Sequence, residues 1–198
     1  AKVAGQKAIA QLTNSANQDP SKIPDLIAAA EANNPELGKD LRSRFVPGVG
    51  IANTTDDAKY LKEVEDRRKN IQANAKAVVD IVKKKGTFEL MGPTSAEIER
   101  RIEQIATDMA KMTDPTSVAR PAEIELVRKS LMDTGLRVQN KTALKQLQNF
   151  YNTVEQRASS AYTSRGMKAP APQSLINTKV VNGVTYIRGP NGEAIPVK

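Results

Sequence analysis

The sequence predicts a mainly α protein, an elongated helical bundle with coiled-coil-like seams, followed by a small C-terminal β-hairpin on a Pro/Ala linker. In three long segments, apolar residues recur three and four positions apart, which places them on one helical face. Aromatic residues make up only 4% of the 198 residues and Trp is absent. Aliphatic residues and Met must therefore form the core, as in helix-on-helix packing. Near the C-terminus an Asn-Gly pair stands between β-branched residues, a strong hairpin signal.

Proline and glycine positions divide the chain into four predicted parts. Short helices and a Pro/Gly connector occupy residues 1–52, and the helical bundle occupies residues 53–166. A linker follows at residues 167–175, where alternating Ala and Pro disfavour helix. The β-hairpin module occupies residues 176–198, where Pro-Asn-Gly gives a second turn before a third short strand.

Three short helices are predicted before the connector. Residues 1–17, rich in Ala, Gln and Asn, form the first. Ser21 caps the second, since its hydroxyl can accept a hydrogen bond from a free amide, and Pro24 lies in the first turn. Asn34-Pro35 ends the second helix and Pro35 opens the third. The apolar residues of these two helices are Ile23, Leu26, Ile27, Ala30, Leu37, Leu41 and Phe45.

The connector at residues 44–52 is apolar and contains Pro-Gly followed by a second Gly. It lacks the G-x-x-x-x-G-K-[ST] pattern of a phosphate-binding loop. The sequence favours a buried, extended connector in which the glycines permit turns. The alternative is a segment that docks into a partner. If this alternative holds, apolar residues of the connector and of the C-terminal hairpin would contact other subunits. These candidate subunit contacts are Phe45, Val46, Val49, Ile51, Val181, Val184 and Tyr186.

The longest helix is predicted from Thr54 or Thr55, either of which can cap it, to about residue 85. Two aspartates follow the cap, where the helix dipole favours negative charge. Arg68 lies in the seam of this helix, and two interpretations are open. Its aliphatic stem can lie on apolar surface while its guanidinium reaches a carboxylate, with Asp57, Glu63, Glu65 and Asp66 available. Alternatively, it is a polar seam residue that fixes the register of the helices. The predicted seam is Leu61, Val64, Arg68, Ile71, Ala75, Val78 and Val82.

Residues 94–131 are predicted to form a helical hairpin. Thr94 and Glu97 fit a capping box, and Pro121 suits the first position of the second helix. The corner at residues 114–121 is longer than a simple turn needs, so we expect it to pack against another element or subunit. The inward residues are Ile98, Ile102, Ile105, Met109, Met112, Ile124, Val127 and Leu131.

The last helix is predicted over residues 141–165, capped by Asn140 and ended by Gly166. Its seam is Leu144, Leu147, Tyr151, Val154, Ala158 and Ala161. Basic residues and two tyrosines along it could bind phosphates and stack bases. The favoured interpretation is instead one core tyrosine with solvated charges. The candidate polyanion contacts are Arg137, Lys141, Lys145, Arg157 and Arg165.

Composition excludes several kinds of chemistry. The chain has no Cys and no His, so disulfides, thiolate nucleophiles and His-based triads or zinc sites cannot be built. We expect no cofactor, no metal site and no enzymatic activity. The sequence contains no run of about 18 apolar residues, the length that a membrane-spanning helix requires. The carboxylates considered for lytic chemistry all have solvent-facing helical spacings; they are Glu97, Glu99, Glu103, Glu123 and Glu125.

The net charge is +8, and the basic excess is concentrated in the C-terminal part. Residues 1–113 hold 18 Lys+Arg and 16 Asp+Glu, while residues 114–198 hold 12 and 6. A basic surface attracts polyanions such as DNA. Nucleic-acid binding through the C-terminal half is therefore the alternative to a purely structural role. The same positive charge is also explained by a surface that only keeps the protein in solution.

Several segments resemble helical virion proteins of tailed phages and prophages. They are RFVPGVG at residues 44–50, GTFELMGP at residues 86–93, the region from TDMAK at residue 107 to SVARP at residue 121, and VNGVTY at residues 181–186. The resemblance covers about residues 40–165 and the C-terminal tail. It implies an internal or ejected, tail or scaffold component, made in the host cytoplasm and located in the virion. The implied partners are further copies of the chain and other virion proteins, and no functional residues carry over.

Overall fold

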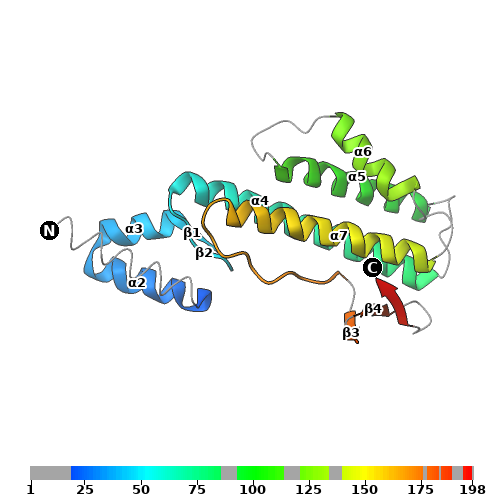
Figure 1. Cartoon of the computed structure of the whole chain (residues 1–198). Helices are drawn as coiled ribbons and strands as arrows, with labels where there is room; N and C mark the ends of the chain where they lie inside the picture. Colours follow the sequence, from blue (N-terminus) through cyan, green and yellow to red (C-terminus); the bar gives the residue numbers. More distant parts are fainter. Residues whose placement is uncertain are drawn as a thin grey trace. The chain divides into compact units, whose positions relative to one another are not determined.

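A computed structural model describes residues 19–85, 93–113, 121–133, 140–175, 178–182, 184–188 and 194–197. These ranges contain six α-helices and two small antiparallel sheets (Figure 1). The mainly α prediction and the packing of helices into a bundle are confirmed. The chain divides into two compact units, Ala1–Glu65 with Ala158–Ala171, and Asp66–Arg157 with Pro172–Lys198. Helices α4 and α7 contribute residues to both units. None of the described helices is long and apolar enough to cross a membrane.

The described part of the first unit begins with a short 3-10 helix, η1 (Pro20–Lys22), followed by α2 (Ile23–Asn33). The prediction that Ser21 caps α2 is wrong, because Lys22 holds the N-cap position without a side-chain bond. Ser21 instead donates from its amide and hydroxyl to Asp19 Oδ1, at 3.2 and 2.6 Å. A carboxylate is a stronger acceptor than a hydroxyl, so Asp19 organises this turn. The side-chain hydrogen bond from Ser21 is the main cause that lowers the pKa of Asp19.

Asn34 separates α2 from α3 (Pro35–Arg44), as the Asn-Pro pair predicts. Its amide donates to the carbonyl of Ala30 at 2.8 Å, and its Oδ1 accepts from the amide of Leu37 at 3.2 Å. One residue therefore ends one helix and caps the next, which brings α2 and α3 together. At their closest approach, a Cβ added to Gly38 would lie 2.4 Å from the Glu31 Cβ. The buried cluster of this region is Ile23, Ile27, Ala30, Leu41 and Ile51.

The connector forms a tight hairpin of β1 (Phe45–Val46) and β2 (Gly50–Ile51). The amide of Val49 donates to the carbonyl of Val46 at 3.1 Å, and Gly48 has φ of 77°. Proline followed by a glycine with positive φ is the pattern of a type II turn. The expected burial is confirmed, because Val46, Val49 and Ile51 are at most 5% exposed. These three residues pack within their own chain, which corrects their assignment as subunit contacts.

Helix α4 (Thr55–Lys85) starts and ends where the sequence predicts. Thr54 is the cap, since its Oγ1 accepts from the amide of Asp57 at 3.0 Å and donates to Asp57 Oδ2 at 2.7 Å. The predicted seam is buried from Leu61 to Val78, and the side chain of Val82 lies outside the described residues. The buried residues of α4 are Ala58, Leu61, Val64, Glu65, Arg68, Ile71, Ala75, Val78 and Val79.

Helices α5 (Pro93–Thr113) and α6 (Pro121–Asp133) form the predicted hairpin. All five predicted inward residues of α5 are buried, and Pro121 opens α6. Helix α5 begins at Pro93, and Glu97 binds Arg101 at 2.7 Å. The side chain of Thr94, on which the predicted capping box depends, lies outside the described residues. Residues 114–120 of the corner lie outside the described residues, as does the side chain of Leu131. On α6, the side chains of Ile124 and Val127 are half-buried.

Helix α7 (Asn140–Thr163) ends in a Schellman motif. The amide of Met167 donates to the carbonyl of Tyr162, the amide of Gly166 donates to the carbonyl of Thr163, and Gly166 has φ of 69°. Glycine therefore ends the helix as predicted. The seam is buried from Leu144 to Ala158, but it ends at Tyr162, which is 0% exposed, rather than at Ala161.

The C-terminal strands are β3 (Thr178–Val181), β4 (Val184–Arg188) and β5 (Ala194–Val197), in an antiparallel sheet of order β3-β4-β5. Val181 pairs with Val184 across the Asn-Gly turn, where Asn182 has φ of 50°. Positive φ at Asn is what a tight hairpin turn of this kind requires. The predicted hairpin and third strand are both present in the described residues.

Candidate functional site

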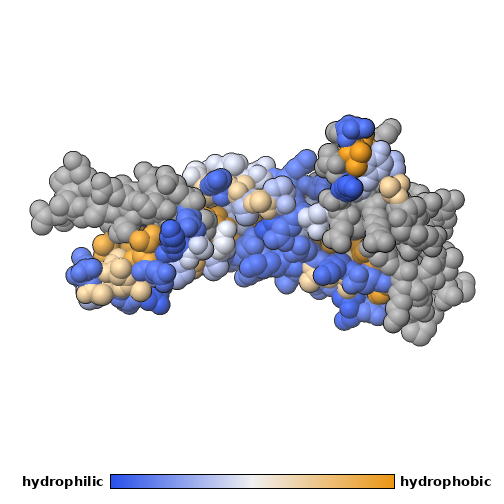
Figure 2. Space-filling model, turned by 90° about the horizontal axis from the view of Figure 1, so that it is seen from below, coloured by the Kyte–Doolittle hydropathy of each residue, from blue (hydrophilic) through white to orange (hydrophobic). Residues whose placement is uncertain are grey.

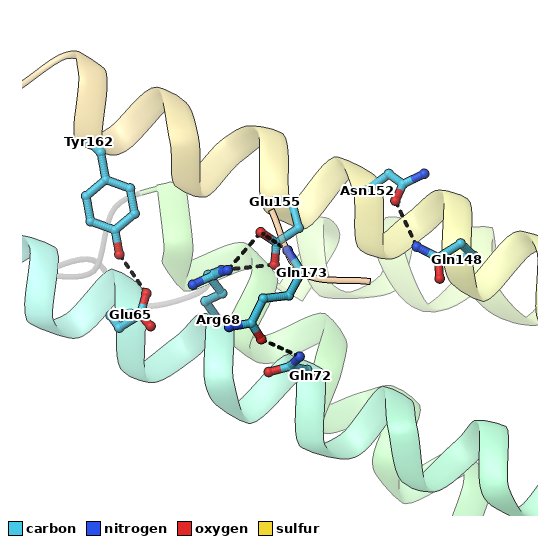
Figure 3. A network of polar contacts seen from close by, with 8 residues as sticks. All are labelled: Glu65, Arg68, Gln72, Gln148, Asn152, Glu155, Tyr162 and Gln173. Carbon is cyan, nitrogen blue, oxygen red and sulfur yellow. Dashed lines mark hydrogen bonds and ion pairs between the residues drawn. The ribbon is translucent and has the colours of Figure 1, made fainter. Parts of the chain in front are cut away.

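The most distinctive group in the second unit is an ion pair between Arg68 on α4 and Glu155 on α7 (Figure 3). Arg68 Nε lies 2.9 Å from Glu155 Oε1, and Arg68 Nη2 lies 2.9 Å from Glu155 Oε2. The side chains are only 3% and 8% exposed. This two-point geometry matches the planar guanidinium to the planar carboxylate. Arg68 thus pairs with a carboxylate on another helix, 87 residues away in the sequence.

Glu155 also binds the segment after α7. The backbone amide of Gln173 donates to Glu155 Oε2 at 3.3 Å, and Gln72 Nε2 on α4 donates to Gln173 Oε1 at 2.6 Å. We name residues 173–175 the strap. Ser174 donates from its hydroxyl to Gln148 Oε1 at 3.3 Å, and Leu175 is 7% exposed. The end of the predicted linker is therefore attached to the helices by side-chain and backbone contacts.

Gln148 extends this polar network along α7. Its Nε2 donates to Asn152 Oδ1 at 2.9 Å, while its Oε1 accepts from Ser174. Gln148 is 3% exposed, so both ends of its buried amide have partners, as buried polar groups require. Figure 3 shows the Gln148–Asn152 bond on α7 and, apart from it, the bond between Gln72 and the strap residue Gln173.

A second ion pair joins α4 to α5. Arg67 Nη1 lies 2.8 Å from Asp108 Oδ1, and Gln104 Nε2 donates to the other oxygen of Asp108 at 3.2 Å. Asp108 is 0% exposed. Its two oxygens are therefore both bound, and the pair holds α5 at a fixed position along α4.

The chemistry available to these carboxylates is limited by their partners. Glu155 accepts three hydrogen bonds and Asp108 accepts two. A general acid or base must reach a substrate proton, whereas these oxygens face arginine, glutamine and backbone donors. Buried pairs of this kind are best attested as devices that specify register and orientation. Among the described residues, no three acidic groups are placed to hold a metal ion.

The first unit contains a separate polar pair, Tyr162 and Glu65. The Tyr162 hydroxyl donates to Glu65 Oε2 at 2.7 Å, and the two residues are 0% and 9% exposed. Tyr151, in the second unit, is also 0% exposed. Both tyrosines of the last seam are therefore core residues, not one as the favoured interpretation held, and neither ring is available to stack on a base.

Three of the predicted polyanion contacts have described side chains: Arg165, Lys145 and Arg157. Arg165 Nε lies 3.2 Å from Asp57 Oδ1, and its guanidinium stacks on the Tyr60 ring at 3.4 Å from the centroid. Lys145 is half-buried and Arg157 is exposed. These two lie twelve residues apart on α7, or about 18 Å along the helix. Arg137 and the side chain of Lys141 lie outside the described residues.

The remaining predicted contacts keep some exposure. Phe45 and Tyr186 are half-buried, while Val181 and Val184 are 43% and 40% exposed. A further apolar residue that the sequence did not single out, Leu126 on α6, is 72% exposed. On the face drawn in Figure 2, hydrophobic residues form small separate areas among mostly hydrophilic ones.

The glutamates considered for lytic chemistry lie on α5 and α6. Glu97 binds Arg101, and Glu125 binds Arg128 Nε at 2.9 Å. Glu99 and Glu103 are exposed, and the side chain of Glu123 lies outside the described residues. The hydrogen bond from Arg128 is the main cause that lowers the pKa of Glu125. Glu125 is thereby held ionised, the opposite of what a general acid needs.

Sequence reasoning did not find Glu155, Asp108 or the strap. Glu155 follows a seam residue directly, and Asp108 precedes one, which is the only local sign that either could be buried. A seam spacing cannot indicate that Arg68 and Glu155, 87 residues apart, meet. No protein-family model, curated protein or solved structure matches the chain.

Proposed function

We propose that the chain is a non-enzymatic structural or assembly component of a phage particle that acts through helix–helix and subunit contacts. The observation that carries this proposal is the Arg68–Glu155 pair. Both members are buried and bind each other through two hydrogen bonds, whereas a catalytic group must be accessible to a substrate. Such a pair defines how α4 and α7 align and offers no atom to a substrate.

The particle itself is suggested by the resemblance of four segments to helical virion proteins. The C-terminal segment supports the proposal, because the Val181 and Val184 side chains are both more than a third exposed. A three-stranded sheet needs a hydrophobic face, or packing against a helix, to be stable by itself. Contact with a second copy or with another virion protein would cover its apolar residues.

The test is mass spectrometry of purified particles, combined with light scattering of the isolated protein. The proposal predicts that the chain co-purifies with intact particles through a density gradient and through a high-salt wash. It also predicts a concentration-dependent mass above that of the 21.5 kDa monomer. A protein that stays monomeric and is absent from washed particles contradicts the proposal.

The alternative function is DNA binding by the basic C-terminal half. The observation that favours it is the burial of Glu155, the one acidic residue of α7, against Arg68. With that charge neutralised, the solvent side of α7 presents only basic charges, including Lys145 and Arg157. This function requires binding that weakens steeply as salt rises.

A gel-shift series separates the two functions. Replacing Lys145 and Arg157 with Gln should weaken DNA binding and reduce the salt slope by about 1 for each phosphate-binding side chain removed. The matched control replaces Lys39 and Lys59, exposed lysines of the first unit, with Gln. Equal effects of both variants would indicate general charge attraction, and no retention at about 50 mM salt would exclude the DNA-binding function.

A further inference from the structure

The strap is held to α4 and α7 by contacts that recognise an extended chain. Glu155 accepts from a backbone amide, Gln72 donates to a carboxamide, and Gln148 accepts from a hydroxyl. The next residue, Leu175, is buried at 7% exposure. The three hydrogen bonds and the burial of Leu175 follow one another along residues 173–175. Together they favour a segment with the residue order Gln, Ser, Leu.

We infer that Gln72, Gln148 and Glu155 form a docking site for an extended Gln-Ser-Leu segment. The chain's own strap fills the site in a monomer, and the strap of a second copy fills it in an assembled form. This inference deepens the proposed assembly role and rests on it only for its biological use. The occupant is a second copy because every copy carries the segment that the site is shaped to bind.

The segment before the strap suits such an exchange. Residues 167–174 form no helix or strand, and the boundary between the two units falls between Ala171 and Pro172. Pro170 and Pro172 fix their φ angles and favour an extended chain. Redirecting this segment to a neighbouring molecule therefore breaks no secondary structure and requires no new interface.

When two molecules exchange their straps, the strap makes the same contacts with the partner molecule that it makes within a monomer. When an identical element is swapped, the bonds at the docking site are the same in both forms, so the balance depends on the hinge and on protein concentration. The strap contacts in this structure are therefore also the contacts of the exchanged dimer.

The experiment uses the absence of cysteine from the chain. One variant of the whole chain carries Lys76→Cys on α4, one helical turn from Gln72 and exposed. The second carries Ala171→Cys, an exposed position two residues before Gln173 that leaves the strap residues unchanged, and a size tag. The two are mixed, unfolded, refolded together and treated with a short bismaleimide, so that a tagged heterodimer can form only between molecules. The matched control pairs Ala171→Cys with Glu99→Cys, an exposed position on α5.

The expected result is a heterodimer from Lys76→Cys that rises over a roughly tenfold increase in protein concentration, because exchange is bimolecular. The Glu99→Cys mixture should stay at background, and adding Leu175→Asp to the tagged chain should remove the product. Equal yields from both mixtures, or a product unaffected by Leu175→Asp, overturns the inference. Because the readout uses purified protein, absence from particles would refute the proposed function while leaving this result intact.

Discussion

Arg67 and Arg68 are neighbours on α4, yet they bind different helices. Arg67 pairs with Asp108 on α5, and Arg68 pairs with Glu155 on α7. Successive residues of an α-helix point about 100° apart, so adjacent side chains can reach different neighbours. Two consecutive residues thereby set the position of α4 against both partners.

Removing one member of the buried pair should destabilise the protein strongly. Glu155→Leu leaves the Arg68 guanidinium buried without its carboxylate, and such changes cost about 3–5 kcal/mol. The double variant Arg68→Met/Glu155→Leu should recover most of that loss, because apolar residues of similar volume can replace a buried pair. Urea unfolding of the single and double variants gives the coupling between them.

The control for this cycle is Lys59→Met, which removes an exposed ion pair on the same helix. Lys59 Nζ lies 3.9 Å from Asp56 Oδ1, and both side chains are largely exposed. Exposed pairs contribute little, so the unfolding midpoint should not move. If Lys59→Met lowered the free energy of unfolding as much as Glu155→Leu, the loss would depend on removing a charge and not on the burial of the ion pair.

Gly38→Ala should destabilise the α2–α3 packing although alanine is the better helix former. The gain from helix propensity is about 1 kcal/mol. The added Cβ would meet the Glu31 Cβ at 2.4 Å, its Cα at 2.5 Å and its backbone nitrogen at 2.8 Å. Overpacking against backbone costs about 1–3 kcal/mol or more, so a net loss is expected in thermal unfolding.

Gly48→Ala provides a comparison for the Gly38 variant. A Cβ there has nothing within 4 Å, but Gly48 has φ of 77°. Its cost should arise from backbone strain alone. If the Gly48 variant is destabilised and the Gly38 variant is not, the result contradicts the close packing of Gly38 on α3 against Glu31 on α2.

Tyr162→Phe should lower stability by about 1–3 kcal/mol, the cost of removing a partner from a buried polar group. The hydroxyl that this change removes donates to Glu65, whose residue is only 9% exposed. Tyr60→Phe is the matched variant, because it keeps the ring on which Arg165 stacks. Comparable losses in denaturant unfolding for both variants would remove the special role of the Tyr162–Glu65 bond.

The Glu125–Arg128 pair gives a pH-dependent prediction. Because the folded-state pKa of Glu125 is lowered, its contribution to stability is present above the unfolded pKa. That contribution is lost as pH falls through the folded pKa. Arg128→Gln removes the main cause, so the Glu125 pKa should rise toward its ordinary value of 4.5. A carboxyl NMR titration measures this directly, and an unchanged pKa refutes the assignment.

Much of the fold follows from local patterns in the sequence. The seams of α4 and α5, the start at Pro121, and the ends at Asn34 and Gly166 depend on residues close in sequence. The seam of α7 shows where that reasoning fails. A strict alternation of three and four residues drifts by about 20° per heptad from a straight helix, so Tyr162 rather than Ala161 is buried at the end.

The candidate site was less accessible to sequence reasoning. Arg68 could be identified as a polar seam residue, but its partner depends on how two distant helices align. The prolines at 170 and 172 predict a segment that does not form helix, and residues 167–174 form neither helix nor strand. The prolines carry no information about what that segment binds, because the amide of Gln173 and the carboxylate of Glu155 meet only in the folded chain.

The contact between Glu155 and the strap also determines which changes at residue 173 the chain tolerates. The donor is the main-chain amide, which nineteen of the twenty amino acids carry and proline alone lacks. The alternating Ala-Pro run at residues 169–172 stops one residue before this position. A proline at position 173, directly after Pro172, would remove a donor that any other substitution preserves.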